Sequence, residues 1–416
     1  MAIVLGFLFW RFGLSIIDQK PKGPITLTYW GLSDEESPIR AVISEFELQN
    51  PNIKVEYNKQ NPINYRTRVQ TQIRDGVGPD VFKIHNSWLP MFISDLALAP
   101  KDIFTVTDYA NTFYPVAVSS FVRGENIYGA PTEIDGLALY YNEEMLSGVG
   151  TPPKNWREFI DAAVKMTVRD PSTGQIQTAG AALGTSSNVD HWSDILGLLI
   201  LQQPGASIDY IATPQVAEVL HFYTGFVTDP RKKTWDVNLP PSTEMFASGK
   251  LGFYFAPSWR ANELKSLNPN LKFKIIPVPQ LSSSFVAWAN FWAEGVSKTS
   301  KNPKEAWQFA KFLTSASTQK LLYQETLKEK LIGKPYSRID LAGELSSDQI
   351  AGAFVSQGSI YKSWYLSSNT LDGDINDEVI KYFQEGVNAV LSGTDPQTVL
   401  QTISSGVREV LGKYNL

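Results

Sequence analysis

Aromatic rings and hydrogen-bonding side chains that stand near one another are the residues of this sequence that could do chemistry. Most of them fall where a loop is expected to follow a strand, and they are Trp30, Asp34, Asn86, Trp88, Glu133, Asp135, Trp192, Trp259, Arg260, Trp288, Asn290 and Trp364. A sugar presents flat C–H faces that stack on rings, and its hydroxyl groups need carboxylate, amide or guanidinium partners. The combination therefore suits carbohydrate binding. For any one tryptophan the alternative is packing in the core, which is less common for residues in loops.

The carboxyl pair Glu133 and Asp135 allows two interpretations. The two residues are separated by one position in an expected strand, so their side chains should point to the same face. Paired carboxyl groups could be the acid and base of a glycoside hydrolase. The alternative, which we favour, is that they accept sugar hydroxyl groups or form salt bridges at a hinge.

Standard catalytic and cofactor motifs are absent from the sequence. Gly76-Val77-Gly78 precedes an expected strand, whereas the glycines of a dinucleotide-binding loop follow one. No Walker A, H-E-x-x-H or G-x-S-x-G string occurs, and the three histidines share no ligand-like spacing. Asp372 to Glu378 resembles the start of a calcium loop, but Asp377 replaces the required glycine and Phe383 the final glutamate. We predict a turn and a helix N-cap there, and no metal, cofactor or catalytic residue in the chain.

Length and composition indicate an ordinary globular protein. The 416 residues suffice for two or three domains, with 43% hydrophobic and 19% charged residues. The net charge of −5 makes nucleic-acid binding an unfavourable hypothesis, because neutralising phosphates requires clustered Lys and Arg. The absence of cysteine excludes disulfides and thiolate metal sites.

The N-terminal residues 1–24 predict a membrane anchor or signal remnant followed by a linker. Ala2 to Trp10 is apolar, Arg11 interrupts the run, Phe12 to Ile17 resumes it, and a Pro-rich polar stretch follows. The run is short for a full span, and it lacks the cationic start and small-residue cleavage site of an ordinary signal peptide. A buried N-terminal helix is the alternative. An uncleaved signal anchor would place the rest of the chain outside the cytoplasmic membrane.

Hydrophobic periodicity predicts the elements that position the candidate residues. We expect strands at Ile25 to Trp30, Ile53 to Tyr57, Val81 to Ile84 and Leu251 to Phe255, and helices at Ser37 to Gln49, Tyr65 to Arg74, Asn155 to Thr167, Val216 to Phe226 and Lys304 to Leu313. The order begins as β-α-β, which favours a doubly wound lobe with parallel strands. Ligands of such sheets sit beyond the carboxyl ends of the strands.

Seven segments, in order along the chain, carry a family resemblance. They are Ile25-Thr-Leu-Thr-Tyr-Trp30-Gly, Phe46-x-x-Gln-Asn-Pro51-Asn-Ile-Lys-Val55, Gly76-x-Gly-Pro-Asp80-Val, Tyr128-Gly-x-Pro131, Leu139-Tyr-Tyr-Asn142, Pro152-Pro-x-Asn-Trp156-x-Glu-Phe and Phe253-x-Phe-Ala-Pro257-Ser-Trp. The chain resembles the extracellular solute-binding proteins of ABC importers, and within them the sugar-binding family that includes maltose-binding protein.

The resemblance implies an α/β, two-lobe periplasmic-binding-protein fold of the Venus flytrap type. Each lobe would be a doubly wound sheet with flanking helices, and a hinge would join the lobes. Lobe I would comprise residues 25–133 and 292–333, and lobe II residues 134–291 and 334–416. Transferred position by position, the resemblance suggests ligand contacts at Trp30, Asp34, Asn86, Trp88, Asp135, Trp192, Trp259, Arg260 and Trp364.

The implied function is that of a non-enzymatic extracytoplasmic receptor. It would bind a carbohydrate by hinge closure and deliver it to ABC transporter permease subunits, as a monomer tethered by its N-terminal segment. The lipidated cysteine of many bacterial relatives is missing here. Three alternatives stay open: the same fold binding a polyamine or a peptide, a hydrolase that uses Glu133 and Asp135, and a scaffold that binds nothing.

Overall fold

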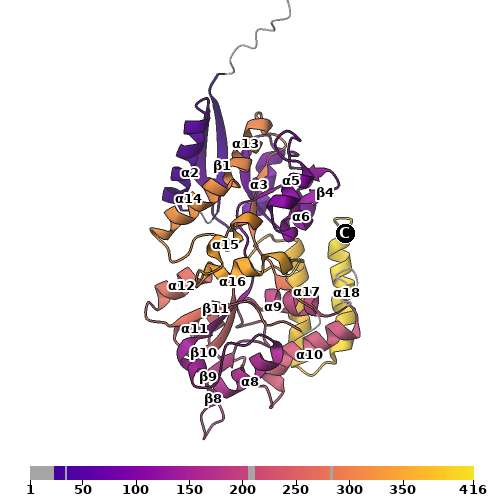
Figure 1. Cartoon of the computed structure of the whole chain (residues 1–416). Helices are drawn as coiled ribbons and strands as arrows, with labels where there is room; N and C mark the ends of the chain where they lie inside the picture. Colours follow the sequence, from indigo (N-terminus) through magenta and orange to yellow (C-terminus); the bar gives the residue numbers. More distant parts are fainter. Residues whose placement is uncertain (1–22, 33–34, 205–210, 282–283) are drawn as a thin grey trace, which may run out of the picture.

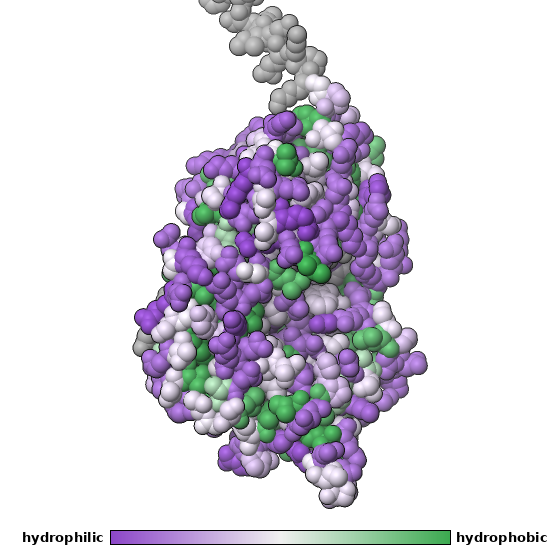
Figure 2. All heavy atoms as spheres, turned by 180° about the vertical axis from the view of Figure 1, so that it is seen from behind, coloured by the Kyte–Doolittle hydropathy of each residue, from purple (hydrophilic) through white to green (hydrophobic). Residues whose placement is uncertain are grey.

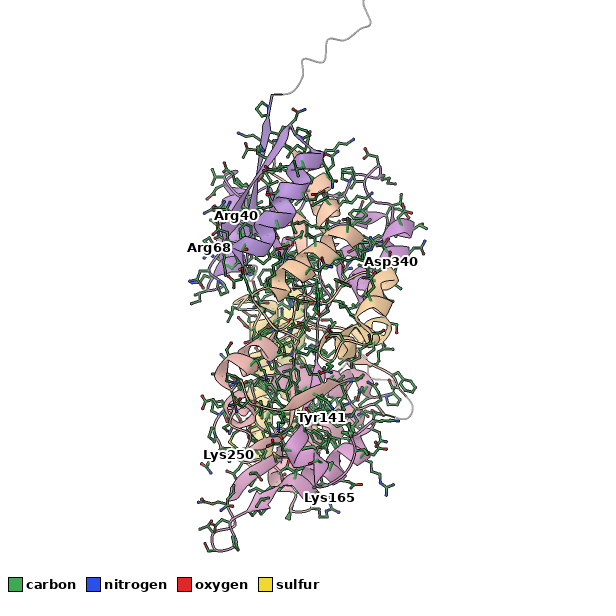
Figure 3. All side chains as sticks on the ribbon, turned by 60° about the vertical axis from the view of Figure 1, so that its left-hand side comes forward. Arg40, Arg68, Tyr141, Lys165, Lys250 and Asp340 are labelled. Carbon is green, nitrogen blue, oxygen red and sulfur yellow. The ribbon has the colours of Figure 1, made fainter. Side chains whose placement is uncertain are left out.

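A computed structural model describes residues 23–32, 35–204, 211–281 and 284–416 (Figure 1). The chain forms two stacked lobes, each built around a five-stranded sheet. In Figure 3, Arg40 and Arg68 mark lobe I, whereas Tyr141, Lys165 and Lys250 mark lobe II. The predicted anchor lies, up to residue 22, outside the described residues. Within the described ranges, no helix has the length and apolar character needed to cross a bilayer.

Lobe I contains the sheet with strand order β2-β1-β3-β13-β6. Its strands are β1 (Ile25–Gly31), β2 (Ile53–Lys59), β3 (Val81–His85), β6 (Ala130–Pro131) and β13 (Trp292–Val296). Its helices are α2 (Glu36–Gln49), α3 (Tyr65–Arg74), α4 (Leu89–Phe92), α5 (Val106–Thr112), α6 (Pro115–Phe121), α13 (Pro303–Leu313) and α14 (Ala316–Leu327). A separate hairpin pairs β4 (Val122–Arg123) with β5 (Asn126–Ile127). The pairs β1·β2 and β1·β3 are parallel, as predicted. β13 is antiparallel to β3 because it enters from lobe II in the opposite direction.

Lobe II contains the sheet with strand order β11-β7-β10-β9-β8. Its strands are β7 (Ala138–Asn142), β8 (Val168–Arg169), β9 (Ile176–Ala181), β10 (Leu251–Ala256) and β11 (Phe273–Ile276). Its helices are α7 (Glu143–Ser147), α8 (Trp156–Met166), α9 (Trp192–Gln202), α10 (Pro214–Thr228), α11 (Ser242–Ala247), α12 (Arg260–Leu267), α17 (Ile375–Leu391) and α18 (Pro396–Gly412). Between the lobes lie η1 (Ile339–Leu341), α15 (Ala342–Leu345), α16 (Ala351–Ser356) and η2 (Gly358–Ile360).

Local sequence explains where the predicted helices begin. At α8, the Asn155 side chain accepts a hydrogen bond from the Glu158 amide at 2.9 Å, and Glu158 in turn accepts one from the Lys154 amide at 2.8 Å. These contacts satisfy backbone donors that have no partner within the helix. Trp156 and Phe159 then turn into the core of lobe II. The predicted start at Asn155 is therefore confirmed, with Asn155 as the N-cap.

Three chain segments cross between the lobes and lie side by side. The amide of Ile134 donates to the carbonyl of Pro335 at 3.0 Å, and the amide of Asn290 donates to the carbonyl of Asp135 at 3.0 Å. A short ladder also pairs β12 (Ala287–Trp288) with β14 (Tyr361–Lys362). Gly136 permits this close approach, because a Cβ there would lie 1.9 Å from the Trp288 carbonyl oxygen. The crossings form one hydrogen-bonded hinge region.

The back of the molecule is mostly hydrophilic. Figure 2 shows apolar side chains there in small separate groups rather than in one continuous patch. Such scattered apolar groups are normal for a protein surface.

Candidate functional site

A cavity of about 480 Å³ lies between the two lobes. Lobe I contributes Leu32, Glu35, Pro38, Pro62, Leu322, Thr326 and Glu329 to its lining, lobe II contributes Pro257, Ser258, Trp259, Asn262 and Glu263, and the crossing segments contribute Glu133, Asp135, Asn290, Trp292, Lys330 and Lys334. Each lobe therefore supplies one wall, and the hinge region supplies the floor. The volume falls within the range of small-molecule sites.

Asp135 connects the floor to the wall formed by lobe II. Its Oδ1 accepts hydrogen bonds from the amides of Gly136 at 2.8 Å and Ser258 at 3.0 Å, and its Oδ2 accepts one from the Ser258 hydroxyl at 2.7 Å. Burial raises the pKa of the Asp135 carboxyl to about 7, although the hydrogen bonds from Ser258 and Gly136 oppose the rise. Near neutral pH this group can therefore either accept or donate a hydrogen bond.

Glu133 is buried on the floor and paired with a lysine from another crossing segment. Its Oε2 lies 2.9 Å from Lys334 Nζ, and its Oε1 accepts a hydrogen bond from the Trp292 amide at 3.2 Å. Trp292 is half-buried and packs edge-on against Trp88, with ring centroids 5.1 Å apart. These contacts fix the orientation of one carboxylate and one indole at the base of the cavity.

Trp259 presents an aromatic surface to the cavity, and its indole is 44% exposed. Two hydrogen bonds fix the turn that carries Trp259. The Tyr140 hydroxyl donates to the Pro257 carbonyl at 2.7 Å, and the Ser258 amide donates to Asp135. The guanidinium carbon of Arg260 lies 4.4 Å from the centroid of the Trp259 ring. The ring is thus a supported platform with an accessible surface.

A buried polar cluster supports this wall from behind. Asp194 Oδ1 accepts hydrogen bonds from Trp288 Nε1 at 2.7 Å and from Asn290 Nδ2 at 3.0 Å. His191 Nδ1 lies 3.5 Å from Asp194 Oδ2, and His191 Nε2 accepts a hydrogen bond from Arg260 Nε at 3.1 Å. Burial raises the pKa of Asp194, but hydrogen bonds and the nearby His191 outweigh that effect and leave it below its usual value.

Four of the predicted contact residues line the cavity, namely Glu133, Asp135, Trp259 and Asn290. The structure corrects two others, because Trp88 and Trp288 have no exposed surface and cannot stack on a ligand here. Trp88 packs between Tyr65 and Phe92 in lobe I. Both indoles are core residues that pack behind the floor.

The other predicted contacts that the structure describes do not line the cavity. Trp192 and Trp364 are buried, Trp30 is half-buried on β1, and Arg260 lies behind Trp259. The side chain of Asn86 is used within the fold, since it donates to Ser363 Oγ at 2.9 Å and accepts from the Phe291 amide at 3.1 Å. Asp34 lies outside the described residues. The side chains of Asn86, Trp192 and Trp364 are therefore buried in the protein and do not line the cavity.

Several cavity residues are not among the predicted contacts. Trp292 and His191 stand next to predicted positions, so the aromatic-plus-polar pattern that selected Asn290 and Trp192 could have included them. Lys330 and Lys334 carry no such signal. Their segment reaches the cavity only because the third crossing lies beside the first, a long-range contact that local sequence does not encode.

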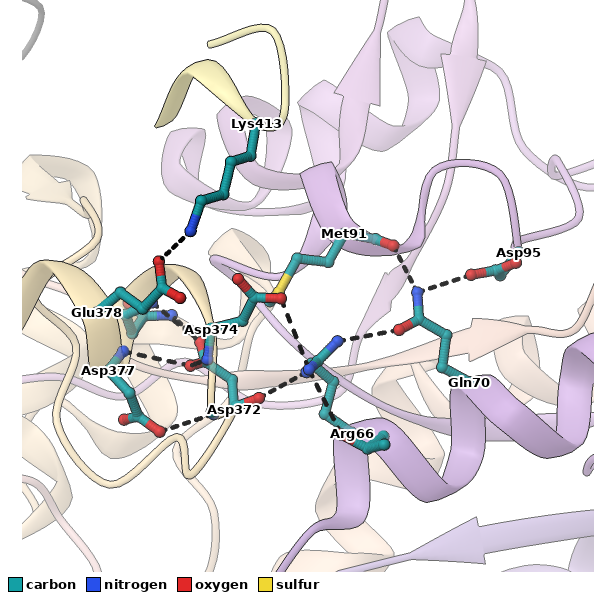
Figure 4. A network of polar contacts seen from close by, with 12 residues as sticks. Arg66, Gln70, Met91, Asp95, Asp372, Asp374, Asp377, Glu378 and Lys413 are labelled. Atoms are coloured by element: carbon teal, nitrogen blue, oxygen red, sulfur yellow. Dashed lines mark hydrogen bonds and ion pairs between the residues drawn. The ribbon is translucent and has the colours of Figure 1, made fainter. Parts of the chain in front are cut away.

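The segment that resembles a calcium loop caps α17 and contacts lobe I (Figure 4). Asp372 Oδ1 accepts hydrogen bonds from the amides of Asp374 at 2.9 Å and Asp377 at 3.2 Å, which confirms the predicted turn and cap. Arg66 of α3 donates to the Asp372 carbonyl at 2.6 Å and lies 3.6 Å from the Asp374 carboxylate. Among the described residues, no group of three or more His, Cys, Asp or Glu is arranged to hold a metal ion.

Comparison with known proteins identifies the fold. The sequence profile of the family described as bacterial extracellular solute-binding protein matches residues 30–320. The multiple sugar-binding protein of Streptococcus mutans is 20% identical over 327 residues, which cover 73% of this chain and 74% of that protein. The structure of the sugar-binding protein MalE of Xanthomonas citri aligns with a TM-score of 0.75 at 19% identity, over 94% of this chain and 98% of the other. The cyclic alpha-maltosyl-1,6-maltose binding protein of Arthrobacter globiformis aligns with a TM-score of 0.74 at 16% identity, over 94% and 100% of the two chains. These similarities confirm the predicted two-lobe α/β fold.

Proposed function

Because the chain belongs to the bacterial extracellular solute-binding protein family, we propose that it captures a neutral sugar or oligosaccharide between its two lobes. It then delivers the sugar to the permease subunits of an ABC importer. Membership of this family places the protein outside the cytoplasm. The observation that carries the choice of carbohydrate is the exposed Trp259 indole beside the buried carboxyl of Asp135 and the half-buried amide of Asn290, all on one cavity.

The chemistry of this arrangement matches a polyhydroxylated ring. An indole surface gains contact area from the C–H face of a sugar at low conformational cost, because the ring is already held in place. Asp135, Asn290 and Ser368 line the same cavity and offer carboxyl, amide and hydroxyl groups to the sugar edges. The names of the Xanthomonas and Arthrobacter structures, which are sugar- and maltose-type binding proteins, agree with this assignment.

The charge balance of the cavity favours a neutral solute over a polyamine. Among the described residues, five acidic side chains line the cavity, and three of them are ion-paired within the chain: Glu35 with Lys59 and Lys330, Glu133 with Lys334, and Glu263 with Arg260. Of the other two, Asp135 has a raised pKa and Glu329 is exposed to solvent. A polycation would have to displace several of these internal ion pairs. A neutral sugar can bind with all of them intact.

The hydrolase alternative gains no support from the geometry of the two carboxyl groups. Glu133 is bound by Lys334, and Asp135 accepts three hydrogen bonds from its own chain. These contacts hold both side chains in place, although the Asp135 oxygens keep acceptor capacity for a ligand hydroxyl. The carboxyl groups of a glycoside hydrolase must instead reach opposite sides of a scissile bond.

A ligand panel tests the proposal. The purified protein is titrated with mono- and oligosaccharides, spermidine and short peptides, while tryptophan fluorescence and the melting temperature are recorded. A sugar at 100 times its dissociation constant adds about 2.7 kcal/mol of stability. A saturable response to a sugar class supports the proposal, whereas a response only to spermidine or peptides refutes the carbohydrate assignment.

Trp259→Ala then locates the site. Loss of the stacking surface should weaken sugar binding about fivefold, because an aromatic contact is worth about 1 kcal/mol. Stability of the apo protein should change by less than about 1 kcal/mol, since the ring is exposed. Phe285→Ala is the matched control, because that ring is 68% exposed and lies outside the cavity lining. A large loss of apo stability would show instead that Trp259 is a structural residue.

We extend the proposal to the attachment of the receptor. Residues 1–24 would tether a monomer to the cytoplasmic membrane, in place of the lipidated cysteine that the sequence lacks. The support for this extension is the apolar run from Ala2 to Ile17, which lies outside the described part of the chain.

A further inference from the structure

Arg260 covers one face of the Trp259 ring with a cation. Its guanidinium carbon lies 4.4 Å from the ring centroid, and the Arg260 side chain is only 13% exposed. Trp259 is nonetheless 44% exposed and lines the cavity, so the ring retains a free surface for a ligand. One face of the Trp259 ring is therefore already covered by Arg260 of the same chain.

A carboxylate completes this intramolecular arrangement. Arg260 Nη1 forms an ion pair with Glu263 one helical turn further along α12, and Glu263 itself lines the cavity. An aromatic face next to a carboxylate is the environment that proteins use to bind ammonium groups. Here the guanidinium of Arg260 fills that position.

Arg260 is also fixed from the protein interior. Its Nε donates to His191 Nε2 at 3.1 Å, so the His191 proton resides on Nδ1, which faces Ser368 Oγ at 3.1 Å and Asp194 at 3.5 Å. A side chain held by His191, Glu263 and the indole cannot move aside without breaking all three contacts. In the structure these three contacts hold the cation on the ring.

We propose that Arg260 determines the specificity of this site, because it occupies the ammonium position formed by Trp259 and Glu263 and thereby excludes cationic solutes. The inference rests on the proposed function, since it assumes that solutes bind at Trp259. A second cation at the ring would meet the guanidinium charge and find Glu263 already paired. The C–H face of a neutral sugar meets neither obstacle.

The test removes the cation and asks whether the site changes its ligand class. Arg260→Met should gain binding of tetramethylammonium, choline and spermidine by about tenfold or more over the wild type, because the ring and the Glu263 carboxylate become available together. The double variant Arg260→Met/Glu263→Gln should lose most of this gain. Arg260→Lys, which retains a cation, should still exclude the probes, and it also controls for folding.

Lys265→Met is the matched control, since it removes the same charge from α12 at a residue outside the cavity lining. It should leave the binding of all three probes unchanged. The inference is overturned if Arg260→Met gains no more than Lys265→Met, or if the wild type binds the cations as tightly as Arg260→Met does. Titration of the wild type with sugars decides the proposed function separately. If no sugar binds, the carbohydrate assignment fails, whatever Arg260→Met does.

Discussion

The pH dependence of stability should reveal Asp135 as a buried carboxyl group. Its pKa is raised from 3.8 to about 7 by burial, so between these values the folded protein holds a proton that the unfolded chain has released. Its contribution to stability is therefore fully present below pH 3.8 and is lost as the pH rises toward 7. Three pH units at about 1.4 kcal/mol each give a loss of about 4 kcal/mol.

His85 should act in the opposite direction over much of the same range. Burial lowers the pKa of its imidazole from 6.5 to about 4, so here the unfolded chain holds the extra proton. Stability from His85 is present above pH 6.5 and is lost as the pH falls toward 4, by about 3 kcal/mol. Between pH 4 and 6.5 the two groups nearly cancel in the wild type.

Asp135→Asn separates the two contributions. Asparagine retains an acceptor for the Ser258 and Gly136 amides but does not titrate, so the stability of the variant should rise by about 3 kcal/mol from pH 4 to 6.5. His85→Gln should show the reverse trend and become less stable with rising pH. Urea unfolding at several pH values between 4 and 8 measures both slopes. If the stability difference between Asp135→Asn and the wild type stays constant from pH 4 to 7, the carboxyl of Asp135 is not protonated in the folded protein and the reasoning is wrong.

The affinity for a sugar should depend on the same ionisation of the Asp135 carboxyl. A sugar hydroxyl that donates to Asp135 is bound more strongly by the ionised form, which falls from about 90% to about 10% between pH 8 and pH 6 for a pKa near 7. Affinity should therefore weaken roughly tenfold over this interval. Asp135→Asn should bind more weakly but with a flat profile. Tighter binding at pH 6 than at pH 8 would show that the protonated carboxyl donates to the ligand.

Two further predictions concern the rest of the chain. Lys83 and Glu294 form an ion pair across β3 and β13 at 2% and 0% exposure, so Lys83→Met should cost about 3 to 5 kcal/mol in urea unfolding, whereas Lys83→Met/Glu294→Met should recover most of it. A double variant as unstable as the single one would rule out loss of the Lys83 countercharge to Glu294 as the cause. The full chain should partition with membranes after cell fractionation, and protein beginning at residue 23 should not. Equal partitioning of the two would refute tethering by residues 1–24.

The elements that sequence predicts well are those defined by local patterns. The α2 helix was expected at Ser37 to Gln49 and spans Glu36–Gln49, because the apolar residues Ile39, Val42 and Phe46 recur at helical spacing. β13 shows where such reasoning stops. Its direction depends on where the chain has been before it returns to lobe I, and no property of Trp292 to Val296 encodes that path.

The same limit applies to the tryptophans of the site. Trp88, Trp259 and Trp288 all stand beside polar residues in the sequence, yet only Trp259 is exposed. Trp288 is buried because its indole nitrogen has a partner in Asp194, 94 residues away. Trp259 remains at the surface because its turn is anchored to Asp135 by Ser258. Whether an aromatic ring meets solvent is decided by such distant partners, so residue type and spacing alone could not separate the three.

The places of the cavity residues within the fold indicate how the site would respond to a ligand. Glu133, Asp135, Asn290 and Trp292 belong to crossing segments that are hydrogen-bonded to each other, so the floor can keep its shape when the lobes rotate. Trp259 and Leu322 belong to opposite lobes, so their separation changes with that rotation. A ligand shifts the equilibrium toward closure only through contacts made more strongly in the closed state. Floor residues should therefore set the affinity of the open protein, and the two walls should set how strongly the ligand drives closure.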